Sequence, residues 1–140
     1  MPARTVYLIK RIETEVTTRM NKALSEFDIT VSLFTVLNFV RDNTNDISAA
    51  QLSRRFGMTS QSMNEVVATL LRKGLIEKSM DMDNKRVQLI SLTKKGADTL
   101  EQCNNIIDTL ESNFFGFLPE SDLHQFRDLI GILLRGLRQS

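Results

Sequence analysis

The chain has 140 residues and a formal net charge of only +1, with 41% hydrophobic and 25% charged residues. This length fits one compact domain, and the composition is that of an ordinary globular protein and not of a disordered one. No run reaches the roughly 18 to 20 apolar residues of a membrane span, and the amphipathic, basic N-terminus lacks the apolar core of a signal peptide. We therefore expect a cytoplasmic protein without membrane contact.

The chain holds one cysteine, Cys103, and one histidine, His124. These numbers exclude an intrachain disulfide, a cysteine-based metal cluster and a catalytic dyad within one chain. The sequence also lacks a phosphate-cradling glycine loop and paired acids at a defined helical spacing. We predict that the protein is not an enzyme and uses neither a metal nor a cofactor.

Cys103 lies in an apolar helical stripe, which favours a buried structural thiol over a redox switch. His124 is interpreted as a surface or interface residue.

Two helices are predicted in the N-terminal third of the chain. Apolar residues recur at spacings of three and four from Val6 to Phe27, which predicts one long helix from about Arg4 to Glu26. Thr30 is suited to cap a second helix, whose apolar positions end near Val40 and which fades within residues 42–46.

The next segment predicts two helices joined by a tight turn. Ser48 and Gln51 have the spacing of a capping box, and Gly57 suits the left-handed position after a helix. Thr59 can cap a second helix, in which Met63 and the apolar residues up to Leu71 form one stripe. The outward face carries side chains that can hydrogen-bond bases or phosphates. They are Ser60, Gln61, Ser62, Asn64, Glu65, Thr69, Arg72 and Lys73.

A β-hairpin is predicted after this pair of helices. Residues 75–80 and 85–92 form two short runs around the turn-rich residues 81–84, and Lys85 and Arg86 lie at the tip. From Ser48 to Lys95 the chain has nine basic and four acidic residues, a formal charge of +5, whereas the remainder sums to −4. This polarity favours a nucleic-acid partner, because a DNA-binding face must neutralise phosphates.

The C-terminal third predicts two more helices. Thr93 can cap the first, whose apolar residues recur from Ala97 to Phe117, and Pro119 suits the first position of the second, whose seam runs from Leu123 to Leu137. The terminal helices carry more apolar surface than a small winged domain covers, which favours a homodimer; packing within one chain is the alternative.

Three runs of the sequence resemble the MarR-type winged-helix regulators of bacteria and archaea. They are residues 50–62 (AQLSRRFGMTSQS), residues 71–78 (LRKGLIEK) and residues 81–96 (DMDNKRVQLISLTKKG), and the resemblance extends over nearly the whole chain. It implies a mainly α fold with a small β-hairpin wing. It further implies one MarR-like domain over 1–140, with the winged helix-turn-helix in 30–95 and helical dimerisation parts in 1–29 and 96–140.

The resemblance also implies how DNA is read. Each protomer of a homodimer would place one helix in the major groove and its wing near the minor groove of a pseudopalindromic operator, with half-sites roughly 34 Å apart. Gln61, Ser62 and Asn64 match the base-facing start of the family's recognition helix, and Arg86 matches its wing arginine. We also assign DNA binding to Ser60, Arg72, Lys73 and Lys85. Two residues depart from the family pattern, namely Asn84, where an aspartate is usual, and Glu65, where a basic residue is common.

Regulation and one rival function stay open at this stage. Members of the family often respond to small aromatic anions, and Tyr7 and Arg11, one helical turn apart, could offer such an effector an aromatic face and a cation. The alternative is an interface tyrosine and a solvated arginine, because one such pair has little specificity. We therefore predict a repressor relieved by a small-molecule effector. Some relatives sense oxidants through a cysteine near the N-terminal helix. That switch does not carry over, because Cys103 lies in the fifth predicted helix. The rival is a winged-helix interaction module whose basic face binds an acidic protein.

Overall fold

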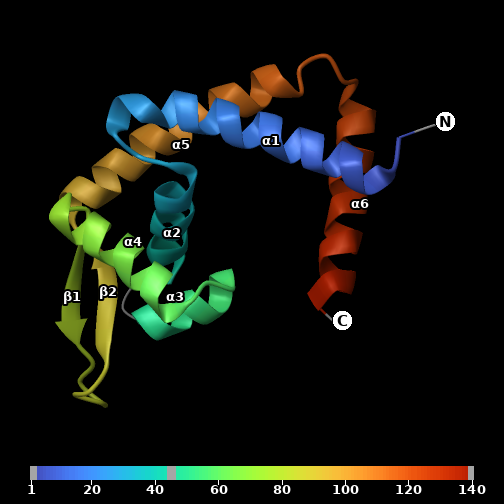
Figure 1. The fold of residues 1–140 in the computed structure, drawn as a ribbon. Coiled ribbons are helices and arrows are strands. Elements are labelled where there is room, and N and C mark those ends of the chain that lie inside the picture. Colours follow the sequence, from blue (N-terminus) through green and yellow to red (C-terminus); the bar gives the residue numbers. More distant parts are fainter. Residues whose placement is uncertain (1–2, 44–46, 139–140) are drawn as a thin grey trace. The chain divides into compact units, whose positions relative to one another are not determined.

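The computed structural model describes residues 3–43 and 47–138 (Figure 1). In chain order its first elements are α1 (Thr5–Leu24), the 3₁₀ turn η1 (Ser25–Phe27), α2 (Val31–Asp42), α3 (Ala49–Phe56) and α4 (Ser60–Arg72). The first helix ends slightly earlier than predicted, because the chain tightens into η1 and then turns at a left-handed residue, Asp28, with φ of 55°. Residues 44–46 of the predicted fading end of the second helix lie outside the described residues.

The second half contains β1 (Ile76–Met80), β2 (Gln88–Leu92), α5 (Lys94–Phe114) and α6 (Glu120–Arg138). The strands pair antiparallel, with Ile76 opposite Leu92 and Met80 opposite Gln88. The second strand therefore starts three residues later than the predicted run, because residues 85–87 belong to the turn. As predicted, Thr93 caps α5, since its hydroxyl accepts from the Gly96 N–H at 2.9 Å.

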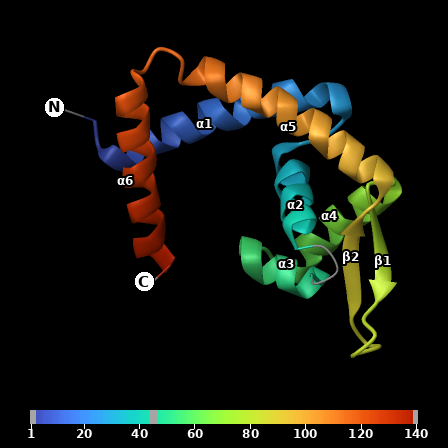
Figure 2. The ribbon, with the colours of Figure 1, turned by 180° about the vertical axis from the view of Figure 1, so that it is seen from behind.

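One buried cluster holds these elements together from the end of α1 to the middle of α5. The central helix is α2, which contacts α1, α4 and β2 and is seen from behind in Figure 2. The buried residues of α2 are Leu33, Phe34, Val36, Leu37 and Val40. Its start is fixed by Thr30, whose hydroxyl accepts from the Leu33 N–H, and by the Asn21 side chain, which accepts from the Val31 N–H at 2.9 Å. The cluster therefore places α4 and the hairpin on one central helix.

The chain forms two compact units, which divide between Ile107 and Asp108 within α5. The first unit contains the buried cluster. In the second, the rings of Phe115 and Phe126 approach to 6.1 Å between centroids, but α6 contains no fully buried residue. The predicted fold class, mainly α with a small β-hairpin wing, is confirmed. The assignment of 30–95 to DNA binding and of the flanking residues to dimerisation stays a prediction.

No single helix among the described residues has the length and hydropathy required to cross a membrane. Within residues 3–43 and 47–138, the pair formed by α1 with η1 and by α2 meets these criteria, and that pair is bent by 76°. Because α2 is the core helix described above, its hydropathy has a structural explanation.

Candidate nucleic-acid interface

The helix-turn-helix is set by three local signals. Ser48 and Gln51 form the predicted capping box, in which each side chain accepts from the other residue's backbone N–H, at 3.3 Å and 2.8 Å. Gly57 follows α3 in a left-handed conformation with φ of 62°, where a side chain would be strained. Thr59 then caps α4 by accepting from the Ser62 N–H at 3.0 Å. The turn is thus held by its own backbone and caps.

The helix α4 separates an apolar side from a polar side. Met63, Val67 and Leu70 are buried in the core. The predicted contact residues Ser60, Gln61, Ser62 and Asn64 are all exposed in the first turns of α4. The Ser62 hydroxyl lies 3.0 Å from the Thr59 hydroxyl, which donates to it. Since winged proteins of this type contact bases mainly through the start of this helix, the arrangement offers a free polar row of the right chemistry.

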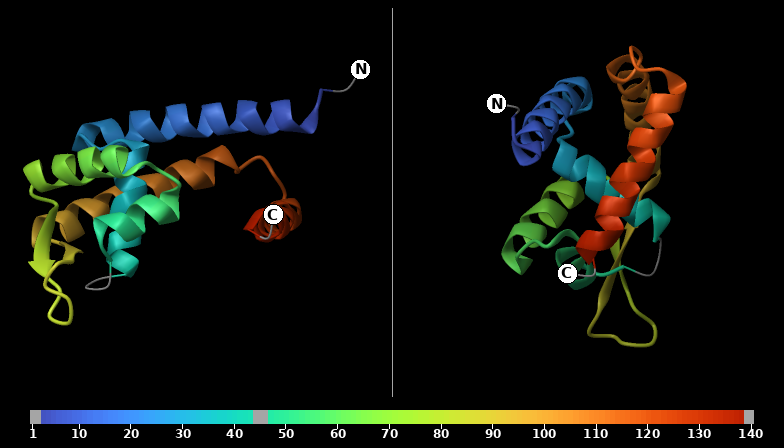
Figure 3. Two further views of the ribbon diagram at one scale, coloured as in Figure 1. Left: turned by 60° about the horizontal axis from the view of Figure 1, so that its bottom comes forward. Right: turned by 90° about the vertical axis from the view of Figure 1, so that its right-hand side faces the viewer.

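The wing is an ordered turn that extends beyond α3 and α4 in both views of Figure 3. The Asp81 N–H donates to the Val87 carbonyl at 3.0 Å, which closes the loop. Within the loop, the Asn84 side-chain oxygen accepts from the Arg86 N–H at 3.1 Å. Asn84 therefore still caps the turn through its oxygen although it lacks the usual negative charge. The side chains of Lys85 and Arg86 are exposed at the tip.

The two basic residues predicted at the end of α4 differ in their surroundings. Arg72 is exposed, and its guanidinium donates to the Thr69 hydroxyl at 3.2 Å. The Lys73 ammonium is hydrogen-bonded to the carboxylate of Asp28, which lies 45 residues earlier in the chain. This hydrogen bond and the charge of Lys73 lower the pKa of Asp28 from its ordinary value, so the carboxylate is ionised at neutral pH. Any stability from this pair is present above the unfolded pKa of Asp28 and is lost as the pH falls through its folded pKa.

Two further arginines belong to the helix-turn-helix. They contribute to the positive charge of residues 48–95, but the sequence assigned them no contact with DNA. Arg54 and Arg55, at the end of α3, are exposed. The Arg55 guanidinium carbon lies 5.4 Å from the centre of the Phe39 ring, and the Phe39 and Phe56 rings meet edge to face. This cation–π contact orients Arg55 and joins α2 to α3. Only the fold brings Phe39 and Arg55 together, so the sequence pattern carried no signal for it.

The predicted effector pair, the single cysteine and the single histidine lie outside the helix-turn-helix and the wing. Tyr7 and Arg11 are both exposed on α1. Cys103 is fully buried, and burial raises the pKa of its thiol, which disfavours the reactive thiolate. His124 is exposed on α6, and its Nε2 lies 3.4 Å from the Asp128 carboxylate.

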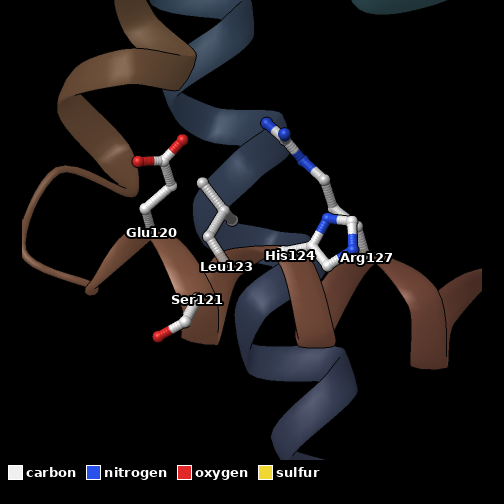
Figure 4. A pocket seen from close by; sticks show the side chains of 5 residues that line it. All are labelled: Glu120, Ser121, Leu123, His124 and Arg127. Atoms are coloured by element: carbon white, nitrogen blue, oxygen red, sulfur yellow. The ribbon is translucent and has the colours of Figure 1, made fainter.

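A shallow hollow of about 390 Å³ lies at the start of α6 (Figure 4). Its lining consists of Glu120, Ser121, Leu123, His124 and Arg127, all from that helix. Glu120, Leu123 and Arg127 lie along one side of α6, as their helical spacing requires. Among the described residues, no group of three or more His, Cys, Asp or Glu could hold a metal ion. The hollow therefore has a charged rim but no constellation for metal binding.

The order of elements and these exposures define a winged helix-turn-helix protein, with a polar helix start and two exposed cations at the tip of the wing. A model described as MarR family matches residues 27–86. The HTH-type transcriptional regulator YdcH of Bacillus subtilis (strain 168) is 30% identical over 100 residues, which cover 69% of this chain and 68% of that protein. The chain therefore belongs to the MarR family.

Solved structures agree with this assignment. The MepR–DNA complex of S. aureus superposes with a TM-score of 0.85 at 23% identity, covering 96% of this chain and 99% of the other. A mutant MarR from E. coli in complex with operator DNA gives a TM-score of 0.82 at 25% identity, covering 91% of each chain. The winged-helix prediction and the family resemblance are confirmed, and the chain is a DNA-binding transcriptional regulator.

Proposed function

We propose that this protein binds a pseudopalindromic operator as a homodimer and represses transcription until a small aromatic anion releases it. The observation that carries the DNA-reading part is the exposed polar row at the start of α4, together with the exposed cations Lys85 and Arg86 at the tip of the wing. Side chains of this kind read base edges, and cations at a wing tip contact the phosphate backbone. MarR of E. coli, with a similar fold, has been solved in complex with operator DNA.

Exposed apolar surface on α1 and α6 supports the homodimer. Each helix presents several large hydrophobic side chains to solvent in the isolated chain, and contiguous patches of this kind mark interfaces. On α1 they are Val6, Tyr7, Leu8, Ile9 and Ile12, and on α6 they are Leu129, Ile130, Ile132, Leu133, Leu134 and Leu137. A two-fold dimer would bury them and would pair two winged domains with the symmetry of an inverted repeat.

Selection of binding sites from random duplex DNA tests the operator proposal. The expected result is an inverted repeat with half-sites about one helical turn, roughly 34 Å, apart, and an affinity that falls steeply with salt. Gln61→Ala should change the base preferred at one position in each half-site. Binding without any preferred sequence, or tighter binding to acidic proteins than to the selected duplex, would overturn the proposal.

Transcription from a template that carries the selected sequence tests repression and relief. The expected result is less transcript with the protein, and recovery when an aromatic carboxylate such as salicylate is added. Calorimetric titration with salicylate should show binding that Arg11→Ala weakens, because the guanidinium would pair with the carboxylate. Lys22→Ala, the same charge loss at the other end of α1, is the matched control and should leave binding unchanged. Increased transcript with the protein alone would contradict repression, and no heat of binding would contradict the effector site.

A further inference from the structure

The residues that follow α4 are tied to two other parts of the first unit. The Lys73 ammonium is paired with Asp28, at the connection between η1 and α2. The Lys73 carbonyl accepts from the Lys95 ammonium at 2.9 Å, and the Gly74 carbonyl accepts from the Thr93 hydroxyl at 2.6 Å. The C-terminal end of α4, which is the proposed recognition helix, is therefore held by the connection between η1 and α2 and by the start of α5.

The partner of Lys73 is carried by a fixed piece of backbone. Asp28 has a left-handed φ of 55°, and its N–H donates to the Ser25 carbonyl at 3.0 Å. The next residue, Ile29, is buried in the core cluster. The Asp28 side chain is 93% exposed, whereas that of Lys73 is only 25% exposed. The lysine is thus the covered member of the pair, and it lies against the molecule instead of extending into solvent.

We propose that Lys73 is a positioning residue, whose pairing with Asp28 fixes the end of α4 for operator reading, and that it is not a phosphate contact. The proposal rests on the operator binding proposed above. It replaces the direct DNA contact that the sequence pattern suggested for Lys73. Its consequence is that Asp28, a negatively charged residue, supports the binding of a negatively charged ligand.

The two roles of Lys73 predict opposite effects when the charge of Asp28 is removed. If Lys73 bound a phosphate, Asp28 would compete with the DNA, so Asp28→Asn would free the lysine, add one unit of positive charge and strengthen binding. If Lys73 positions α4, Asp28→Asn loosens the helix end and weakens operator binding despite the added charge. Asparagine tolerates the left-handed backbone about as well as aspartate does, so the substitution tests charge and not strain.

The experiment compares the affinity for the selected operator of wild type, Asp28→Asn, Lys73→Met and the double variant. Exposed ion pairs contribute little, so we expect each single variant to bind about two- to fivefold more weakly. The double variant should lose no more than either single one, because both remove the same pair. Glu26→Gln is the matched control: Glu26 is exposed two residues away, and no ion pair joins it to the rest of the described chain. It should bind the operator at least as tightly as wild type.

Salt dependence separates a positioning role from a phosphate contact, because only the loss of a phosphate contact lowers the salt slope. Lys73→Met should keep the wild-type salt slope on unrelated duplex, whereas Lys85→Ala should reduce that slope by about 1. Lys73→Arg, which can still pair with Asp28, should restore operator binding. Melting temperatures establish that each variant is folded, and if Lys73→Met does not fold, Lys73→Gln takes its place.

The outcomes separate this inference from the function on which it rests. Wild-type protein without any preferred sequence would overturn the proposed function. A wild-type preference together with Asp28→Asn binding that equals or exceeds that of Glu26→Gln would overturn only the positioning role. A reduced salt slope for Lys73→Met on unrelated duplex would likewise identify Lys73 as a phosphate contact.

Discussion

The winged part of the first unit and the helix α6 of the second are both rich in apolar residues, yet they place them differently. In the winged part, α2, α3, α4 and the strands bury most of theirs in or against one cluster. Along α6 none is fully buried, and six large ones are exposed. The difference indicates that the winged part completes its core within one chain, whereas α6 does not, which is the basis of the dimer surface proposed above for α6.

The largest effect is expected where that surface is broken. Leu133→Asp puts a charge in the middle of the exposed apolar residues of α6 and should prevent dimer formation. Because two linked half-site contacts become one, operator affinity should fall by about 10²- to 10⁴-fold. Sedimentation measures the oligomeric state, and a gel-shift assay measures the affinity. Gln125→Asp, the same charge at an exposed polar position of α6, is the control. A dimeric Leu133→Asp variant with wild-type affinity would contradict the role given to α6.

A core substitution should act on stability within the single chain. Leu37→Ala removes a fully buried side chain from the centre of α2 and should lower the free energy of unfolding by about 2–5 kcal/mol. Met82→Ala, at a side chain that is 88% exposed in the wing, should change it by less than about 0.5 kcal/mol. Urea denaturation measures both. Equal losses for the two variants would mean that the wing tip is as firmly packed as the core.

Local signals explain why much of the fold could be predicted from the sequence. Ser48 and Thr59 cap their helices through residues three positions away, and the spacing of Met63, Val67 and Leu70 assigns the buried face of α4 without knowledge of the rest of the chain. The exposed row opposite to it followed from the same spacing, which is why the predicted start of the recognition helix lies on the surface.

Contacts between distant segments were beyond such reasoning. Asp28 and Lys73 are separated by 45 residues, and neither belongs to a motif that mentions the other. The contact of Arg55 with Phe39 likewise depends on how α3 packs on α2. The early start predicted for the second strand has a local origin instead. Lys85 and Arg86 have no intrinsic turn signal, and the hydrogen bonds from Asp81 to Val87 and from Val87 to Asn84 assign them to the loop.

A smaller effect is expected at the wing. Arg86→Ala removes an exposed cation from the tip, and operator affinity should fall by about tenfold with a smaller salt slope. Fluorescence anisotropy with a labelled operator at several salt concentrations measures both quantities. Arg127→Ala removes the same charge from α6 and should leave the affinity within about twofold. Identical losses for the two arginines would show that net charge, and not the wing, determines binding.

The smallest effect is expected at Cys103. Its thiol is buried and its pKa is raised, so alkylation by iodoacetamide should be slow in the native protein at pH 8 and fast after denaturation. Mass spectrometry follows the modification. Duplex binding should survive treatment with peroxide, and an oxidised Cys103 in protein that has lost DNA binding would refute the inert role.

The close approach of Gly96 to Leu75 has a mechanical consequence. A Cβ placed at Gly96 would lie 1.9 Å from the Leu75 carbonyl oxygen, so the first turn of α5 rests directly on the backbone between α4 and β1. At this contact the backbones of Gly96 and Leu75 meet without a side chain between them. A side chain at position 96 would therefore push the start of α5 away from the segment that joins α4 to β1, and it would disturb the Thr93 N–H to Leu75 carbonyl hydrogen bond beside it.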